Sequence, residues 1–173
     1  MGDEVISVLY DADTIAARVE AMGKEIRSFY GDEPIICIGV LKGSFIFLAD
    51  LVRQLPGDVE CSFLGVQSYE GTTSTGDVRI THDLRGQIRD RHVLLVEDIV
   101  DTGLTLSYLL DTLGVRGPKS IKVAALLDKP SRRQVPVPID FIGFSIPDAF
   151  VIGYGLDVDG RYRNLPYVGV FEG

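Results

Sequence analysis

The sequence predicts an α/β fold, built as a doubly wound, mostly parallel sheet flanked by helices. Two apolar runs, at 35–41 and 93–96, have the uninterrupted pattern of strands that are buried on both faces of a parallel sheet. Each run leads into a glycine-containing turn and then into a helical pattern, so strands alternate with helices. The first strand and the tail from Ile146 do not fit this alternation. We expect them to form a small hood over the carboxyl ends of the strands, where such sheets bind ligands.

The individual elements follow from apolar periodicity and from turn residues. Asp13 can cap a first helix that begins near residue 14 and ends before Gly31. The core face expected for this helix consists of Ile15, Val19, Met22, Ile26 and Phe29. The remaining expected elements are strands at 4–10, 35–41, 59–68, 78–83, 93–96, 120–127 and 141–144, and helices at 45–55 and 104–113.

Length and composition indicate one globular domain that spans residues 1–173, with 46% hydrophobic and 24% charged residues. The formal net charge of -8 disfavours binding to nucleic acid or to an anionic membrane through bulk charge. No apolar run approaches the roughly 20 residues that a membrane helix requires, and no signal peptide is evident, so we expect a cytoplasmic protein. Cys37 and Cys61 lack Cys-x-x-Cys pairing, and we interpret both as buried apolar residues.

Carboxylates and a small-residue turn follow the apolar run at 93–96. Glu97 and Asp98 come first, and Asp101 opens the turn Asp-Thr-Gly-Leu-Thr at 101–105, directly before a helix. Free N–H groups and the helix dipole at such a junction favour a bound anion. The three carboxylates would repel a bound anion. A ligand that carries a phosphate, a diol and a metal ion would satisfy both the anion site and the carboxylates. The alternative interpretation is that the acids are merely solvated at the end of the strand.

Two further segments have the composition of a ligand-binding site. Lys42, Gly43 and Ser44 form a second strand–turn–helix junction after the run at 35–41. The stretch 68–77 has no aliphatic side chain and is rich in Gly, Ser and Thr. This composition suits either a mobile lid over a substrate or a disordered connection between two antiparallel strands, and it leaves both interpretations open.

Four separated segments resemble, in order, motifs of the hypoxanthine-guanine phosphoribosyltransferases, purine salvage enzymes of the type I phosphoribosyltransferase group. They are Val-Leu-Lys-Gly at 40–43, Ser-Tyr at 68–69 with the following loop, the run at 93–105, and the tail at 146–167. The resemblance implies transfer of a ribosyl 5-phosphate from phosphoribosyl diphosphate (PRPP) to hypoxanthine or guanine, with release of pyrophosphate. One alternative is a xanthine-preferring enzyme. Another is a nucleic-acid-binding regulator that keeps the fold, which the acidic charge and the retained Asp101 disfavour.

The resemblance also implies a role for each site residue. Asp101 is expected to be the general acid/base that acts on purine N7, with helix capping as the alternative. Glu97 and Asp98 would engage the ribose hydroxyls, directly or through Mg²⁺, and Asp157 would add a metal-binding carboxylate. The residues expected to bind PRPP and pyrophosphate are Lys42, Gly43, Ser68, Tyr69, Glu97, Asp98, Asp101, Thr102, Gly103, Leu104, Thr105 and Arg163. The residues expected to bind the purine are Lys129, Phe150, Val151 and Asp157.

Further expectations from the resemblance concern the backbone, two departures and the assembly. The Leu41–Lys42 peptide bond is expected to be cis or otherwise strained. Leu104 stands where some relatives carry a basic residue, so phosphate binding would rest on N–H groups and threonines. Ser44 replaces a second glycine and is small enough to preserve function. The loop at 69–76 is expected to close over PRPP, and the protein to form a homodimer or homotetramer.

Overall fold

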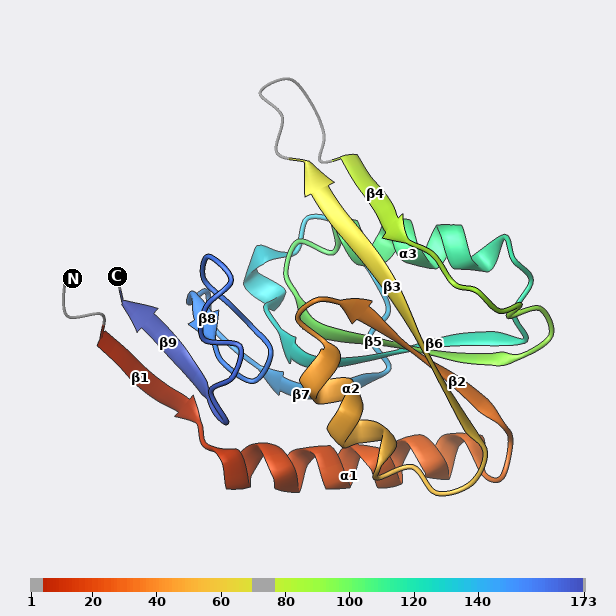
Figure 1. Ribbon diagram of the computed structural model, residues 1–173, viewed down its shortest axis with the longest axis horizontal. Coiled ribbons are helices and arrows are strands. Elements are labelled where there is room, and N and C mark those ends of the chain that lie inside the picture. The colour runs from red at the N-terminus through yellow and green to blue at the C-terminus, as the bar shows by residue number, and fades with distance from the viewer. Residues whose placement is uncertain (1–4, 70–76, 173) are drawn as a thin grey trace.

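The computed structural model describes residues 5–69 and 77–172. Its centre is a six-stranded sheet with the order β4-β3-β2-β5-β6-β7, shown in Figure 1. Among the paired strands of this sheet, the edge strand β4 runs antiparallel to β3 and all other neighbours are parallel. The predicted doubly wound, mostly parallel sheet is confirmed.

The bounds of the elements agree closely with the sequence patterns. The strands are β1 (Val5–Tyr10), β2 (Ile35–Leu41), β3 (Val59–Tyr69), β4 (Asp77–His82), β5 (His92–Val100), β6 (Ser120–Asp128), β7 (Phe141–Ser145), β8 (Val151–Ile152) and β9 (Val168–Glu172). The helices are α1 (Ala12–Tyr30), α2 (Phe45–Val52) and α3 (Leu104–Gly114), with a short 3₁₀ helix η1 (Pro130–Arg132).

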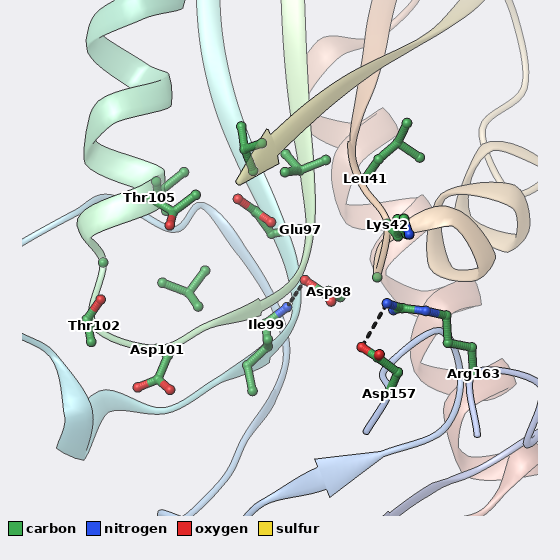
Figure 2. A pocket seen from close by; sticks show the side chains of 16 residues that line it. Leu41, Lys42, Glu97, Asp98, Ile99, Asp101, Thr102, Thr105, Asp157 and Arg163 are labelled. Atoms are coloured by element: carbon green, nitrogen blue, oxygen red, sulfur yellow. Dashed lines mark hydrogen bonds and ion pairs between the residues drawn. The ribbon is translucent and has the colours of Figure 1, made fainter. Parts of the chain in front are cut away.

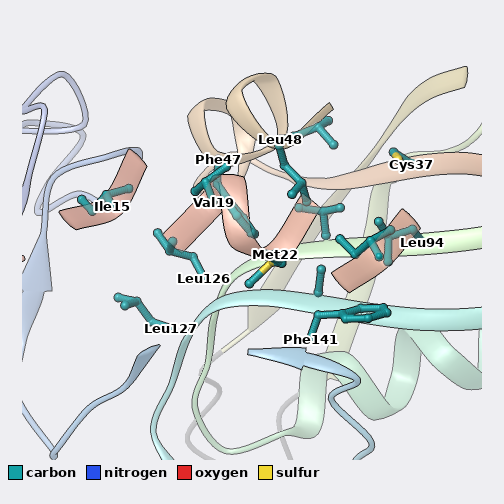
Figure 3. Packing of buried hydrophobic residues seen from close by; sticks show 14 of the residues in the cluster. Ile15, Val19, Met22, Cys37, Phe47, Leu48, Leu94, Leu126, Leu127 and Phe141 are labelled. Carbon is teal, nitrogen blue, oxygen red and sulfur yellow. The ribbon is translucent and has the colours of Figure 1, made fainter. Parts of the chain in front are cut away.

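Two apolar layers cover opposite faces of the main sheet. In β2, Cys37 packs into the layer that contains α1 and α2, whereas its neighbour Ile38 packs into the layer that contains α3. Leu94 and Leu95 of β5 divide in the same way. Because both faces are covered, apolar and polar residues do not alternate along the central strands, and their sequences are continuous apolar runs. Figure 3 shows side chains of α1 and α2 lying over the strands in the first layer.

The first helix differs from its expected form at both ends. Asp11, and not Asp13, is the cap, because its Oδ1 accepts a 2.8 Å hydrogen bond from the Thr14 backbone N–H. Asp13 lies in the first turn, where a negative charge still complements the helix dipole. At the other end Phe29 is 55% exposed, and Tyr30 takes the buried position. The second helix is also shorter than expected, since α2 ends at Val52.

The two cysteines occupy different environments. Cys37 is buried as expected, but Cys61 is exposed, so the prediction for Cys61 is wrong. Cys61 and Phe63 are two residues apart in β3 and therefore share one face of the strand, and both are exposed. The described helices leave this part of β3 uncovered, which the sequence of the strand alone does not indicate.

A separate three-stranded sheet with the order β1-β9-β8 forms the predicted hood. Its strands come from both ends of the chain, since Val5 of β1 pairs with Glu172 of β9 in antiparallel register. β8 pairs with the other edge of β9, and Figure 1 shows the hood beside the end of the main sheet. The ring of Tyr10 stacks on Phe144 of β7, with 3.9 Å between ring centroids, and so connects the hood to the main sheet.

Candidate active site

A cavity of about 320 Å³ lies at the carboxyl ends of β2 and β5, beside the N-terminus of α3. Figure 2 shows the turn between β5 and α3 on one side, and the end of β2 with the Asp157 and Arg163 side chains on the other. The residues predicted for the site that line this cavity are Lys42, Gly43, Glu97, Asp98, Asp101, Thr102, Gly103, Thr105, Asp157 and Arg163.

The turn between β5 and α3 builds the first wall. β5 continues beyond the apolar run, so Glu97 and Asp98 lie within the strand and Asp101 opens the turn. Gly103 has a φ of 86°, and a Cβ atom at this position would lie 2.8 Å from the Val135 carbonyl oxygen. The turn therefore requires glycine there. The N–H groups of the first turn of α3 lack intrahelical partners beside the cavity, an arrangement that favours a bound anion.

Glu97 and Asp98 bring two carboxyl groups to the floor of the cavity. Burial raises the pKa of Glu97 well above its ordinary value, and the neighbouring charge of Asp98 raises it further. Burial also raises the pKa of Asp98 to about 6, against the lowering effects of a 2.8 Å hydrogen bond from the Ile99 N–H and of the Arg163 charge. A cation or a hydroxyl donor in the cavity would stabilise the ionised form of both groups.

The junction after β2 forms the opposite wall. The Leu41–Lys42 peptide bond is cis, which confirms the prediction. Gly43 lies directly against Asp98, since a Cβ atom on Gly43 would fall 1.6 Å from Asp98 Oδ2. Ser44 is buried, and its Oγ donates a 2.7 Å hydrogen bond to a carbonyl oxygen of β2. The Ser44 side chain is thus accommodated at the start of α2.

Arg163 and Asp157 reach the cavity from the segment between β8 and β9. Arg163 Nη2 lies 2.8 Å from Asp157 Oδ1, and Arg163 Nη1 donates a 2.6 Å hydrogen bond to the Gly155 carbonyl oxygen. Figure 2 shows this ion pair opposite Asp98. Both side chains are more than two-thirds buried, with 24% and 29% exposed, so the pair is part of the cavity wall.

A second group of predicted residues lies beside Asp101 and outside the lining of the cavity. Lys129 is buried and is therefore not a solvated loop residue, and its Nζ lies 3.9 Å from Asp148 Oδ1. Arg132 bridges the two acids, with Nη1 at 3.6 Å from Asp148 Oδ2 and Nε at 3.3 Å from Asp101 Oδ1. These contacts connect Asp101 with Lys129.

Phe150 and Val151 continue this second group on the hood. Phe150 is 53% exposed, and its ring meets Phe171 edge-on with 6.1 Å between ring centroids, so it is not a core residue. Val151 is buried in β8. Leu104 is 37% exposed at the start of α3 and does not line the cavity. An exposed aromatic ring such as that of Phe150 is suited to stack on a planar ligand.

Asp101 does not cap α3 in this structure. The cap position is Gly103, without a side-chain hydrogen bond to the helix, and Thr102 Oγ1 accepts a 3.3 Å hydrogen bond from the Leu104 N–H. The side chain of Asp101 instead accepts from Arg132. Its carboxylate therefore stands at the lip of the turn and is available to a ligand.

The carboxyl groups fit a magnesium ion that takes part of its ligands from a substrate. Within residues 5–69 and 77–172, no three His, Cys, Asp or Glu side chains gather to hold one metal ion. Glu97, Asp98 and Asp157 therefore do not form a site of three protein carboxylates. Mg²⁺ commonly takes one or two carboxylates and completes its shell with water and phosphate oxygens. Glu97 and Asp98 are adjacent on β5 and both line the cavity, so their carboxylates suit that smaller set.

Sequence reasoning assigned no role to several residues of the site. The apolar walls of the cavity are formed by Val40, Val66, Ile99, Val100 and Leu106. Arg132 and Asp148 were detectable only as charges near Lys129 and Phe150. Gly155 lies in the matching tail segment at 146–167 but was given no role, although its Cα lies so close to the Gly43 carbonyl oxygen that a Cβ atom would fall 2.2 Å from it. The side chains of Ser68 and Tyr69, and the whole loop 70–76, lie outside the described residues, so the predictions for them stay predictions.

Comparison with known proteins identifies the family. Residues 6–159 match the phosphoribosyl transferase domain. The chain is 48% identical to the hypoxanthine phosphoribosyltransferase of Haemophilus influenzae, over 95% of this chain and 94% of the relative. It is 46% identical to the hypoxanthine-guanine phosphoribosyltransferase of Bacillus subtilis, over 99% and 96% of the two chains. A crystal structure of a hypoxanthine-guanine phosphoribosyltransferase from Bacillus anthracis matches with a TM-score of 0.92 at 40% identity, covering 95% of this chain and 97% of that chain. The chain belongs to the phosphoribosyl transferase family, in its hypoxanthine-guanine phosphoribosyltransferase branch.

Proposed function

We propose that this chain transfers the 5-phosphoribosyl group of PRPP to hypoxanthine, guanine or both, and forms IMP or GMP and pyrophosphate. The observation that carries the proposal is the convergence of four features on one cavity: an acidic strand end, a helix N-terminus, a Lys-Gly junction and an arginine. These features complement a ligand with a ribose diol, a phosphate and a pyrophosphate. Family membership supports the same class of reaction.

The turn 101–105 would hold the 5-phosphate. Backbone N–H groups at the start of α3 and the hydroxyls of Thr102 and Thr105 are donors beside the cavity. Leu104 contributes no charge, so the affinity for the phosphate rests on these donors. Glu97 and Asp98 lie next to the turn on β5, where they would accept hydrogen bonds from the ribose hydroxyls.

Glu97 and Asp98 also offer the carboxylates for Mg²⁺. The ion, when bound with PRPP, would neutralise negative charge on the pyrophosphate and so make it a better leaving group. The carboxylates themselves stabilise the positive charge that develops on the ribose ring, as in other reactions with an oxocarbenium-like transition state. Lys42, the N–H of Gly43 and Arg163 would receive the pyrophosphate, and Asp157 orients Arg163.

The second group of residues would bind the purine. Phe150 presents an exposed ring for stacking, and Lys129 supplies a cationic donor to the 6-oxo group. Backbone groups of Val151 and Asp157 would form hydrogen bonds with the remaining edge of the purine ring. As N9 of the purine attacks C1 of the ribose, the C1–O bond breaks and its electrons leave with pyrophosphate. Asp101 takes up the proton that the purine must lose, at N7.

Two other functions are weaker. A xanthine-preferring enzyme would use the same site, and xanthine differs from hypoxanthine only at an edge that backbone groups would read. A regulator that binds nucleic acid is disfavoured by the net charge of -8.

The proposal includes one domain over residues 1–173, a homodimer or homotetramer, and a cytoplasmic location. No described helix is long and apolar enough to cross a membrane.

Initial rates with PRPP, Mg²⁺ and each of four bases test the proposal. We expect nucleotide formation with hypoxanthine or guanine, release of one pyrophosphate for each nucleotide, and no reaction with adenine. Xanthine as the fastest base would favour the xanthine-preferring enzyme. Absence of nucleotide with all four bases, together with a gel shift of nucleic acid, would overturn the proposal in favour of the regulator.

A further inference from the structure

We propose that a hydrogen bond between Tyr154 and Asp50 positions the hood segment over the Lys42–Gly43 junction, which makes Tyr154 a positioning residue for the pyrophosphate side of the site. The inference rests on the proposed function, because it concerns how the same site binds PRPP. Neither residue lines the cavity of the candidate active site, and neither is expected to touch a substrate.

The bond joins two elements that are far apart in sequence. Tyr154 follows β8 in the hood, and Asp50 lies in α2. Tyr154 Oη donates a 2.5 Å hydrogen bond to Asp50 Oδ2, and only 6% of Tyr154 is exposed. Burial raises the pKa of Tyr154, and the bond to Asp50 raises it further, so the phenol stays protonated and is the donor. Hydrogen bonds that involve an ionised partner are stronger than neutral ones.

The backbone directs the Tyr154 side chain away from the cavity. Gly153 and Leu156 exchange two backbone hydrogen bonds of 3.0 Å, which close a tight turn around Tyr154 and Gly155. Tyr154 has a φ of 50° and Gly155 a φ of 102°. Tyrosine seldom adopts this left-handed conformation unless other contacts hold it there. The bond to Asp50 is such a contact.

The same turn holds Arg163. The Gly155 N–H donates a 2.9 Å hydrogen bond to the Arg163 carbonyl oxygen, and the Gly155 carbonyl oxygen accepts a 2.6 Å bond from Arg163 Nη1. Tyr154 adds a 2.9 Å backbone bond to Leu165. A shift of the turn therefore moves both the main chain and the guanidinium of the proposed pyrophosphate-binding arginine.

The turn also rests on the Lys42–Gly43 junction. The Cα of Gly155 lies against the Gly43 carbonyl oxygen, and α2 begins two residues later, at Phe45. A closed path therefore runs from Gly43 along α2 to Asp50, across the hydrogen bond to Tyr154, and back through Gly155. Loss of the Tyr154–Asp50 hydrogen bond removes one of the contacts that hold Gly155 against Gly43.

The purine side of the site is held independently. Val151 pairs with Val170 of β9, and Phe150 accepts a 2.9 Å backbone hydrogen bond from Phe171. Neither contact passes through Asp50. Loss of the Tyr154–Asp50 bond should therefore affect PRPP binding more than purine binding.

The aromatic ring of Tyr154 has support of its own, which allows the hydroxyl to be tested alone. The ring packs in the core layer of α1 and α2, and with Ile15, Ile46 and Pro166 it lines a second cavity of about 340 Å³. Tyr154→Phe keeps these apolar contacts and removes only the donor. It leaves the Asp50 carboxylate without its buried partner, which is the costly way to break such a bond.

Steady-state kinetics of Tyr154→Phe, Asp50→Ala and the double variant test the inference. We expect Tyr154→Phe to raise the KM for PRPP about tenfold, since a hydrogen bond to a charged group is typically worth that much or more. The KM for hypoxanthine should stay within about twofold. Asp50→Ala should act in the same direction, and the double variant should be no worse than the more affected single variant, because both remove one bond. Asp50→Asn keeps an acceptor and should restore much of the PRPP affinity.

Arg53→Gln is the matched control. Arg53 pairs with the same Asp50 carboxylate from the solvent side and is 71% exposed, so its loss should leave both KM values unchanged. An active Tyr154→Phe enzyme with unchanged KM for PRPP would overturn the inference, and so would an equal rise in both KM values, which would indicate a general structural defect. If Tyr154→Phe fails to fold, as shown by thermal unfolding, the comparison of Asp50→Ala with Arg53→Gln decides: a raised KM for PRPP in Asp50→Ala alone supports the inference, and an unchanged KM for PRPP in both variants overturns it. A wild-type protein that forms no nucleotide would instead overturn the proposed function.

Discussion

Gly43 and Asp98 touch across the candidate active site. A Cβ atom on Gly43 would lie 1.6 Å from Asp98 Oδ2 and 2.6 Å from Asp98 Cγ, so the carboxyl group occupies the space that any other side chain would need. The contact joins the carboxyl ends of β2 and β5, which are neighbouring parallel strands. The position of the acid thus depends on the absence of a side chain at Gly43, in the junction after the facing strand β2.

Gly43→Ala should displace Asp98 and lower kcat/KM by about 10²-fold or more, because misplacement of a site group by about 1 Å has effects of that size. Gly114→Ala is the control, since a Cβ atom at the end of α3 meets nothing within 4 Å. Initial rates and thermal unfolding should be measured for both variants. Equal activity of the two would show that Asp98 has room to move without consequence.

Asp101→Asn should lower kcat by about 10² to 10⁴ while the affinity for PRPP survives, because asparagine keeps the shape of the side chain but cannot take the purine proton. Binding of PRPP by calorimetry, beside turnover of hypoxanthine, separates the two effects. Asp111→Asn, at an exposed position of α3, serves as the control. Near-normal turnover of Asp101→Asn would remove the proton-transfer role.

Lys129→Gln should lower kcat/KM for hypoxanthine and guanine with little effect on PRPP binding. A site built around a cationic donor discriminates strongly for a carbonyl oxygen and against an amino group, since the wrong base leaves a buried polar group unpaired. Lys24→Gln is the control, because Lys24 is 75% exposed. Full activity of Lys129→Gln on both bases would mean that the ammonium group serves only its contact with Asp148.

The two thiols should react at very different rates. Burial raises the pKa of Cys37 to about 12 and shields the sulfur, whereas Cys61 is exposed to the reagent, although partial burial and the charge of Glu60 also raise its pKa. A disulfide reagent at pH 8 should therefore label Cys61 quickly and Cys37 only after unfolding. Cys61→Ser should abolish the fast phase, which absorbance of the released thiolate measures. Rapid labelling of two thiols in the native protein would contradict the burial of Cys37.

Patterns that depend on neighbours in sequence predicted most of the fold. The run at 35–41 predicted β2 with its observed bounds. A strand that is covered on both faces is apolar along its whole length, so the ends of the apolar run mark the ends of the strand. The acids and the turn at 97–105 were equally visible, since the whole motif lies on one strand end and one helix N-terminus. The cap of α1 was placed two residues late, because Asp11 and Asp13 both suit the pattern and only the path of the chain after β1 selects Asp11.

Contacts between distant segments were not predictable in this way. The Arg132 bridge from Asp101 to Asp148 depends on η1 folding back beside the turn. The exposure of Cys61 depends on which strands α1 and α2 cover. These relations arise from the placement of whole elements, and a single sequence carries no local signal for them.

The pairing of β1 with β9 has a consequence for synthesis of the protein. β1 leaves the ribosome before the other described strands, but its hydrogen-bonding partner Val168–Glu172 is the last of them to be made. Strands β2 to β7 contain all their partners by residue 145 and can assemble as the chain emerges, since chains fold from the N-terminus during translation. The hood closes last. A chain that stops short of Val168 therefore retains the complete main sheet but leaves β1 as an unpaired strand edge, and such an edge is a template for aggregation.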